Sequence, residues 1–129
     1  MAGALTISTL NDSSGVLATQ NGMTGIAKAW VRYAGATGTI TSSFNVSSVT
    51  LNSTGYWTIA FTTAMTDANY SVVGSLSATS GTGQANVFQP FTVVSTGGTT
   101  APTTSSFVCS SINGGGTAPV YACVAVLGN

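Results

Sequence analysis

A period-two alternation of apolar and polar residues restricts the fold of this chain more than any other feature. It recurs in short runs from Ile26 onward, and such alternation is typical of half-buried β-strands. Turn-forming clusters rich in glycine separate the runs, at 35–38, 52–55, 80–83, 96–99 and 113–116. The alternation predicts strands at 26–33, around Phe44 and Val46 (on one shared face), and at 56–62, 70–76, 86–94, 105–111 and 120–127.

Strands and turns at this spacing predict an all-β fold, an antiparallel β-sandwich or jelly roll built from residues 26–129. No segment shows the 3.6-residue period and the end caps of a helix. Pro90 interrupts an otherwise good strand. Because proline cannot donate to a β-ladder, we expect an edge strand or a bulge there.

Residues 1–25 differ from the rest of the chain. Short apolar pieces at 4–7 and 16–18 are broken by polar residues at 11–15 and by Asn21-Gly22, without a strong period. We expect an extended N-terminal arm with one or two short strands that lies along a neighbouring subunit. A frayed terminus is the alternative.

Charged residues make up only 3% of the chain, against roughly 25% in a typical soluble domain. They are Asp12, Lys28, Arg32 and Asp67; histidine and glutamate are absent, and the net charge is zero. Two cations do not form a basic stripe, so no nucleic-acid partner is expected. A neutral, mildly hydrophobic chain tends to self-associate, which favours an obligate homo-oligomer over a monomer solvated by Ser, Thr, Asn and Gly.

The mean hydropathy of +0.41 is not a membrane signal. The longest apolar stretch, 120–127, has the length of one strand and is too short for a spanning helix. The first seven residues have no basic region and no sustained apolar core, so we expect no secretory signal and no membrane partner.

The residues needed for catalysis are scarce. General acid–base chemistry needs a group that titrates near the working pH, and the chain offers two aspartates. Asp12 and Asp67 both lie in turn-like contexts, where an aspartate caps the local backbone. We therefore expect no enzyme activity and no cofactor.

Cys109 and Cys123 are the two cysteines. A nucleophilic cysteine needs a base, and a zinc site needs more ligands, so neither catalysis nor metal binding is expected. If the strands at 105–111 and 120–127 form a hairpin, a register that pairs the two cysteines is plausible and a disulfide is conceivable. Free buried thiols are favoured over a disulfide in a reducing bacterial cytoplasm.

Lys28, Trp30 and Arg32 share one predicted strand face. A cationic and aromatic stripe of this kind can bind sugar or an anionic surface. The alternative, which we favour, is that Trp30 packs in a subunit interface and the two cations reach its rim. Trp57 is a second aromatic candidate for an interface or glycan face.

Three colinear stretches carry a resemblance to a known module: Ile26-Ala-Lys-Ala-Trp-Val-Arg-Tyr, Ser43-Phe-Asn-Val-Ser-Ser-Val-Thr, and Gly55-Tyr-Trp-Thr-Ile-Ala-Phe-Thr-Thr-Ala-Met-Thr-Asp-Ala-Asn-Tyr-Ser-Val-Val. They resemble a module that recurs in tail-fibre and other virion proteins of tailed bacteriophages, and they span the middle third to half of the chain. The resemblance implies a phage structural protein, made in the bacterial host cytoplasm and located in the virion. It transfers no catalytic residues.

In long fibres this module follows shaft repeats, whereas here it begins close to Met1. This departure favours a small capsid decoration or cement protein, a homotrimer bound to the major capsid protein or another virion protein. One alternative is a tail-fibre tip that recognises host-surface glycan. A free lectin-like binding module is the other.

Overall fold

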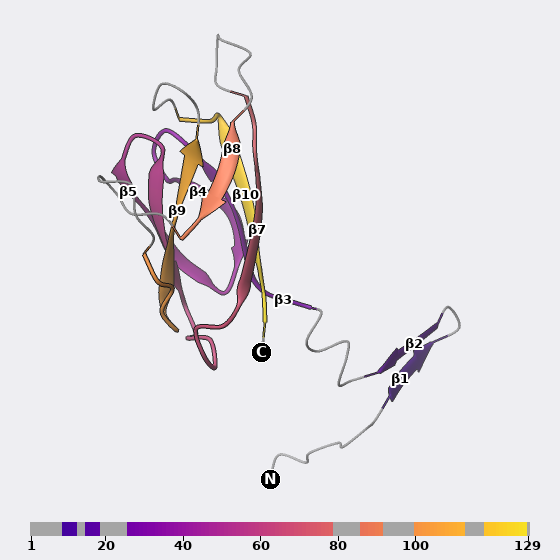
Figure 1. Cartoon of the computed structure of the whole chain (residues 1–129). Helices are drawn as coiled ribbons and strands as arrows, with labels where there is room; N and C mark the ends of the chain where they lie inside the picture. The colour runs from indigo at the N-terminus through magenta and orange to yellow at the C-terminus, as the bar shows by residue number, and fades with distance from the viewer. Residues whose placement is uncertain are drawn as a thin grey trace.

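The computed structural model describes residues 9–12, 15–18, 26–78, 86–91, 100–112 and 118–128. These residues form ten strands and no helix, which confirms the all-β prediction. Eight strands make two four-stranded antiparallel sheets (Figure 1). The other two, β1 (Thr9–Asp12) and β2 (Gly15–Ala18), pair only with each other.

Each sheet has two central strands that come from distant parts of the chain. The β3–β10 sheet has the order β4 (Ile40–Phe44), β3 (Ala27–Ala34), β10 (Tyr121–Leu127), β7 (Ser71–Leu76). The β6–β9 sheet has the order β5 (Val46–Ser53), β6 (Tyr56–Phe61), β9 (Ser106–Ile112), β8 (Val87–Pro90). The edges of the sheets are therefore β4, β7, β5 and β8.

The hydrophobic core lies between the inner faces of the two sheets. The ring of Tyr33 in β3 meets the ring of Trp57 in β6 edge-on, with 5.5 Å between ring centroids. As the period-two pattern predicted, every second residue is buried: Ala29, Val31 and Tyr33 in β3, and Trp57, Ile59 and Phe61 in β6.

One strand prediction is wrong. Phe44 and Val46 do not share a strand face, because β4 ends at Phe44 and β5 begins at Val46 in the other sheet. Asn45 between them has a φ of 54°, in the left-handed region, and it turns the chain from one sheet to the other. Phe44 is 55% exposed as a result, whereas Val46 is buried.

The side chain of Asn45 stabilises this turn between β4 and β5 with hydrogen bonds. Its Nδ2 donates to the carbonyl oxygens of Lys28 and Thr63, both at 3.1 Å. Its Oδ1 accepts from the backbone N–H of Thr63 at 2.7 Å. Asparagine tolerates left-handed backbone better than most residues, so a single residue both makes the turn and ties β3 to the end of β6.

We expect Asn45→Ala to lower the free energy of unfolding by about 2–4 kcal/mol, because three hydrogen bonds are lost and alanine is strained at this φ. Asn45→Gly removes the same bonds but accepts the backbone conformation, so its loss is expected to be smaller. Urea unfolding followed by tryptophan fluorescence measures both. Equal stability of the alanine variant and the wild type would contradict the stabilising role of Asn45 in this turn.

The edge position predicted for Pro90 is confirmed. Pro90 is the last residue of β8, the edge strand of the β6–β9 sheet, and it lies opposite Cys109. The predicted continuation of this strand beyond Phe91 lies outside the described residues, as do the predicted turns at 80–83, 96–99 and 113–116.

The strands expected within the first 25 residues are present as β1 and β2. They flank positions 13–14, and their register pairs Leu10 with Leu17 and Asp12 with Gly15. The remainder of the predicted arm, including 4–7, lies outside the described residues.

Candidate functional site

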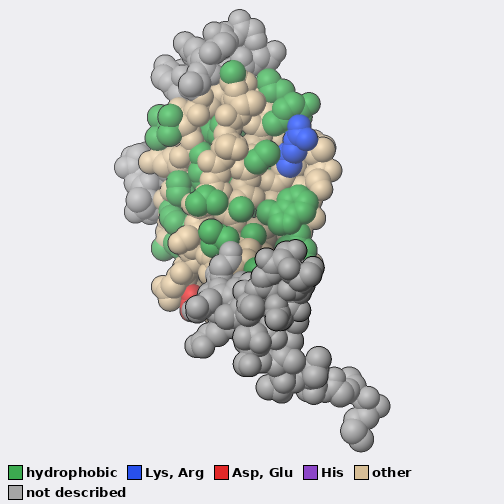
Figure 2. Space-filling view, turned by 90° about the vertical axis from the view of Figure 1, so that its right-hand side faces the viewer, with side chains coloured by type: hydrophobic (Ala, Val, Ile, Leu, Met, Phe, Trp, Pro, Cys, Tyr) green, Lys and Arg blue, Asp and Glu red, His purple; other side chains and the backbone are tan. Residues whose placement is uncertain are grey.

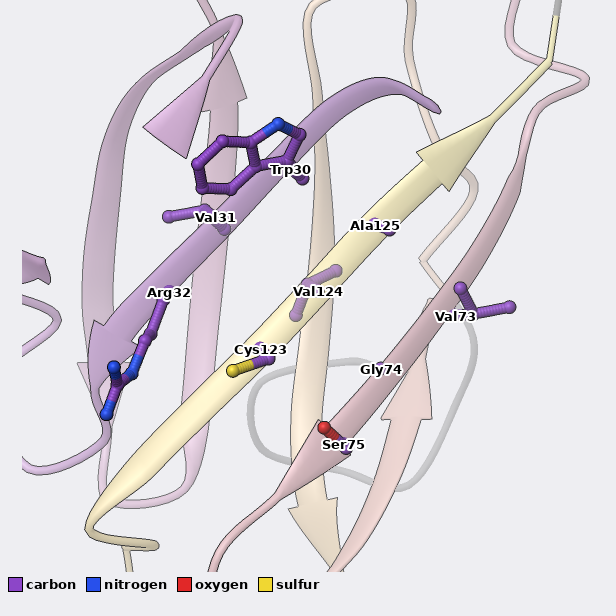
Figure 3. Close-up of a pocket in the computed structure, with 9 residues that line it drawn as sticks. All are labelled: Trp30, Val31, Arg32, Val73, Gly74, Ser75, Cys123, Val124 and Ala125. Carbon is purple, nitrogen blue, oxygen red and sulfur yellow. The ribbon is translucent and has the colours of Figure 1, made fainter. Parts of the chain in front are cut away.

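A trough runs along β10 on the outer face of the β3–β10 sheet. Strand register sets Trp30, Ala125 and Val73 in one cross-strand row and Arg32, Cys123 and Ser75 in the next (Figure 3). Neighbours in such a row lie about 5 Å apart, so their sizes decide the shape of the surface. The small side chains of Cys123 and Ala125 on β10 lie beside the larger Trp30 and Arg32 on β3 and Val73 on β7, and this face has a hollow of about 540 Å³.

The trough and its surroundings are mainly apolar. Trp30 is 40% exposed and Val73 is 52% exposed, and Phe44 lies beside Trp30 on β4. Figure 2 shows this face with hydrophobic side chains spread among uncharged polar ones and a basic group near its edge. Large exposed apolar side chains gathered on one face mark a binding surface more often than a solvated one.

Arg32 is the charged residue of the trough. Its guanidinium carbon lies 4.7 Å from the ring centroid of Tyr121, a cation–π contact at one end of the hollow. Within the part of the chain that the structure describes, no carboxylate forms an ion pair with Arg32.

The structure brings together two of the three residues of the predicted cationic stripe. Trp30 and Arg32 line the trough, whereas Lys28 does not. On β10, Val126 pairs with Ala29 of β3, but the next residue, Leu127, pairs with Ala27. This shift in register skips Lys28, which has no partner residue on β10. Lys28 is partly buried.

Trp57 does not lie on a surface face, so its prediction as an interface or glycan residue is wrong. It is fully buried in β6, on the inner face of the other sheet. Its Nε1 donates to the carbonyl oxygen of Gly35 at 3.0 Å, which satisfies the only polar atom of the side chain. The period-two pattern that sets Trp57 with Ile59 and Phe61 is the core pattern.

The two cysteines lie on strands that are not neighbours in either sheet. The strands that carry them, β9 and β10, belong to different sheets, so they do not form the hairpin on which a pairing of Cys109 with Cys123 depended. Both are free thiols; Cys109 is buried and Cys123 is exposed in the trough, so the expectation of buried thiols holds for Cys109 alone. Burial raises the pKa of the Cys109 thiol to about 12, which opposes thiolate chemistry there.

Asp67 acts on its own turn, as predicted: its Oδ1 accepts from the backbone N–H of Asn69 at 2.7 Å. Asp12 is the last residue of β1. Among the described residues, no three side chains of His, Cys, Asp or Glu group together as metal ligands would. No helix in the same ranges is long and apolar enough to cross a membrane.

The sequence did not identify the residues that β7 and β10 contribute to the trough. Val73, Ser75 and Ala125 line it, but no motif marks them. Their outward positions follow from the alternation in 70–76 and 120–127. No local signal in the sequence shows that β10 lies between β3 and β7.

Comparisons with known proteins found no relative of this chain. No protein-family model, no curated protein and no solved structure matches the chain. The phage-module resemblance stays a prediction.

Proposed function

We propose that this chain is a non-catalytic structural protein of a tailed-phage virion. In this proposal it is a capsid decoration or cement protein that works as a homotrimer, with a β-sandwich body and the 1–25 segment as a bridging arm. The observation that carries the self-association is the apolar outer face of the β3–β10 sheet. The phage assignment comes from the sequence resemblance at 26–73.

The argument for self-association is one of surface chemistry. A sheet face that stays in water normally carries polar or charged residues at its outward positions. Here those positions include Trp30, Phe44 and Val73, each at least 40% exposed. Covering this face with protein removes apolar area from water at about 25 cal/mol per Å².

A decoration protein gains from having several weak attachments. Three arms on one trimer share a high effective concentration, so each single contact can be weak while the whole clamp holds. Strands rich in Ser, Thr and Asn can add to an exposed sheet edge through backbone hydrogen bonds and need no charged side chains. A chain with 3% charged residues suits this mode of binding.

Sedimentation velocity of the purified chain at micromolar concentration tests the assembly. We expect a trimer for the wild type and a folded monomer for Trp30→Glu, because the new carboxylate would be buried in the interface. Val87→Glu is the matched control, since Val87 is 60% exposed but lies on the other sheet, in β8. A monomeric wild type would overturn the proposal.

The location is tested on purified phage particles. A decoration protein is expected in hundreds of copies per particle and a tail tip in far fewer, so a quantitative gel separates the two. Deletion of residues 1–25 is expected to leave a folded domain that no longer attaches to the capsid. A few copies located on the tail would contradict the capsid assignment.

Glycan binding is a second candidate, favoured by the geometry of the trough. Trp30 offers an exposed aromatic face, and Arg32 and Ser75 offer polar groups beside it. Titration calorimetry against host-surface oligosaccharides is the test. Binding that is lost in Trp30→Ala, with the fold intact, would favour a receptor-binding tip or a lectin-like module over the decoration protein.

A further inference from the structure

Three of the four edge strands of the two large sheets carry a feature that hinders pairing with a further strand. Proteins protect such edges with bulges, proline, charge or short length. The register of β4 against β3 skips Thr41, and that of β5 against β6 skips Ser47 and Asn52. The edge strand β8 has four residues and ends at Pro90.

The fourth edge strand, β7, carries none of these features. Its six residues pair with β10 in an unbroken register and include no charged residue and no proline. Four of the six are exposed. In the part of the chain that the structure describes, no strand pairs with the other side of β7 (Figure 1), so this edge is open to a further strand.

The register shows which backbone groups of β7 point to the open edge. The N–H of Ser77, just after β7, donates to the carbonyl oxygen of Tyr121 at 2.9 Å. Hydrogen-bonded pairs alternate with non-hydrogen-bonded pairs in an antiparallel ladder, so every second residue back along β7 also bonds to β10. The residues between them point their N–H and C=O to the open edge: Val72, Gly74 and Leu76. Among the described residues, these outward groups have no hydrogen-bond partner.

The side chains at this edge are neutral and partly apolar. Val72 and Leu76 are half-buried against the core. Gly74 lies between them, and a Cβ added there would be 2.8 Å from the ring of Phe88, which fills the place of the missing side chain. Part of the apolar surface of Val72, Leu76 and Phe88 therefore stays exposed at an edge that has no charge.

We propose that β7 pairs antiparallel with β7 of a second copy, about a two-fold axis at Gly74. In this register Val72 lies opposite Leu76 of the second copy, and the two Gly74 residues lie opposite each other. Every outward residue then exchanges both of its backbone hydrogen bonds with an outward residue of the other strand. The contact is isologous, and it joins the two β3–β10 sheets into one.

Charge and side-chain size favour a second copy as the partner. Arg32 lies on β3, two strands away from β7, so the two guanidinium groups are on the order of 20 Å apart and repel each other little. On the inner face, Val72 and Leu76 of the two copies cover each other. The absence of a side chain at Gly74 lets the two Phe88 rings approach at the axis. These contacts remove apolar surface from water.

This contact is distinct from the proposed trimer interface. The backbone groups of the edge lie in the plane of the sheet, whereas the trough opens on the outer face. Each proposed trimer has three such edges, so the contact can join neighbouring trimers; this use alone rests on the proposed function. Few hydrogen bonds form, and each contributes little net free energy, so we expect weak pairing in dilute solution. On a particle the effective concentration is higher.

Amide hydrogen exchange followed by NMR tests the pairing. Trp30→Glu is used, because it is expected to remove the trimer and leaves β7 unchanged. Exchange at Val72, Gly74 and Leu76 is expected to slow roughly tenfold when the protein concentration reaches about ten times the dissociation constant of the pair. The N–H groups of Val73 and Ser75 already bond to β10, so their exchange should not change and they serve as the control within the same strand.

Disulfide cross-linking tests the register. Val73 and Ser75 lie on the outer face (Figure 3), and across the axis they form a non-hydrogen-bonded pair with Cα atoms about 4.5 Å apart, which suits a disulfide. The background is Trp30→Glu with Cys123→Ser, because Cys123 pairs with Ser75 and would compete. Oxidation of an equal mixture of Val73→Cys and Ser75→Cys is expected to give a covalent dimer on a non-reducing gel. Each variant alone should give far less, because identical positions are about 7 Å apart.

The outcomes separate this inference from the proposed function. Exchange at Val72, Gly74 and Leu76 that is equal at low and high concentration would overturn the pairing of β7. A mixture that gives no more covalent dimer than either variant alone would overturn it as well. A wild type that is not a trimer, with the cross-link present, would overturn the proposed trimer and leave the pairing of β7 in place.

Discussion

Replacing Trp57 with alanine is expected to lower the free energy of unfolding by about 4 kcal/mol. The side chain is fully buried between the sheets, packs edge-on against Tyr33 and donates to the carbonyl oxygen of Gly35. Alanine would leave a large cavity and an unpaired carbonyl, and both cost free energy. This loss is a large part of the stability of an ordinary domain, so the variant is expected to be partly unfolded at 37 °C.

Trp30→Ala is the matched control, because it removes the same side chain from the outer face of the other sheet. We expect it to cost less than about 1 kcal/mol in the isolated monomer while it weakens the trimer. Urea unfolding, extrapolated across protein concentrations, separates the two effects. Equal losses at Trp57 and Trp30 would contradict the assignment of one tryptophan to the core and the other to the interface.

Raising the pH above 9 is expected to destabilise the fold, whereas stability should change little between pH 5 and 8. The chain has no histidine or glutamate to titrate in the neutral range. Burial raises the pKa of Cys109 from 9.0 to about 12. Burial also raises the pKa of Tyr70 from 10.0 to about 12 and that of Tyr33 still further.

The sign follows from the direction of these shifts. A folded-state pKa above the unfolded value means that the unfolded chain gives up its proton first, so stability is complete below pH 9 and falls as pH rises through 9 to 12. For Cys109 alone the loss is about 1.4 kcal/mol per pH unit in that window. The tyrosines add to it above pH 10.

Urea midpoints at pH 7, 8, 9, 10 and 10.5 measure this loss. Cys109→Ala should reduce the slope between pH 9 and 10, although its stability at pH 7 is lower because a small cavity forms. A midpoint that stays constant up to pH 10.5, or that already falls between pH 5 and 8, would contradict the account.

Local alternation was sufficient to predict most strands, because the period of two is a property of the strand itself. The segments 26–33 and 56–62 correspond to β3 and β6, and in each the alternating residues of one face are buried. The turn at 35–38 is present as well: Gly38 has a φ of 74°, and its N–H donates to the carbonyl oxygen of Ala34. Pro90 likewise indicated an edge strand, because proline has no N–H to donate to a neighbouring strand, and β8 is an edge strand.

The wrong strand predictions lie where the chain moves from one sheet to the other, which a local sequence pattern does not show. Phe44 and Val46 have the spacing of one strand face, but the left-handed Asn45 between them moves the chain to the other sheet. The spacing of Cys109 and Cys123 suits a hairpin, but β9 and β10 separate into different sheets.

By itself, the sequence determined that this chain folds into short, nearly uncharged strands, and that Trp30 and Arg32 lie on the outer face of one of them. Only the tertiary structure decided that β10 separates β3 from β7, which makes the small side chains of Cys123 and Ala125 the floor of a trough. The reason is physical: alternation fixes which face of a strand is buried, whereas the neighbours of a strand depend on how all strands together cover the core.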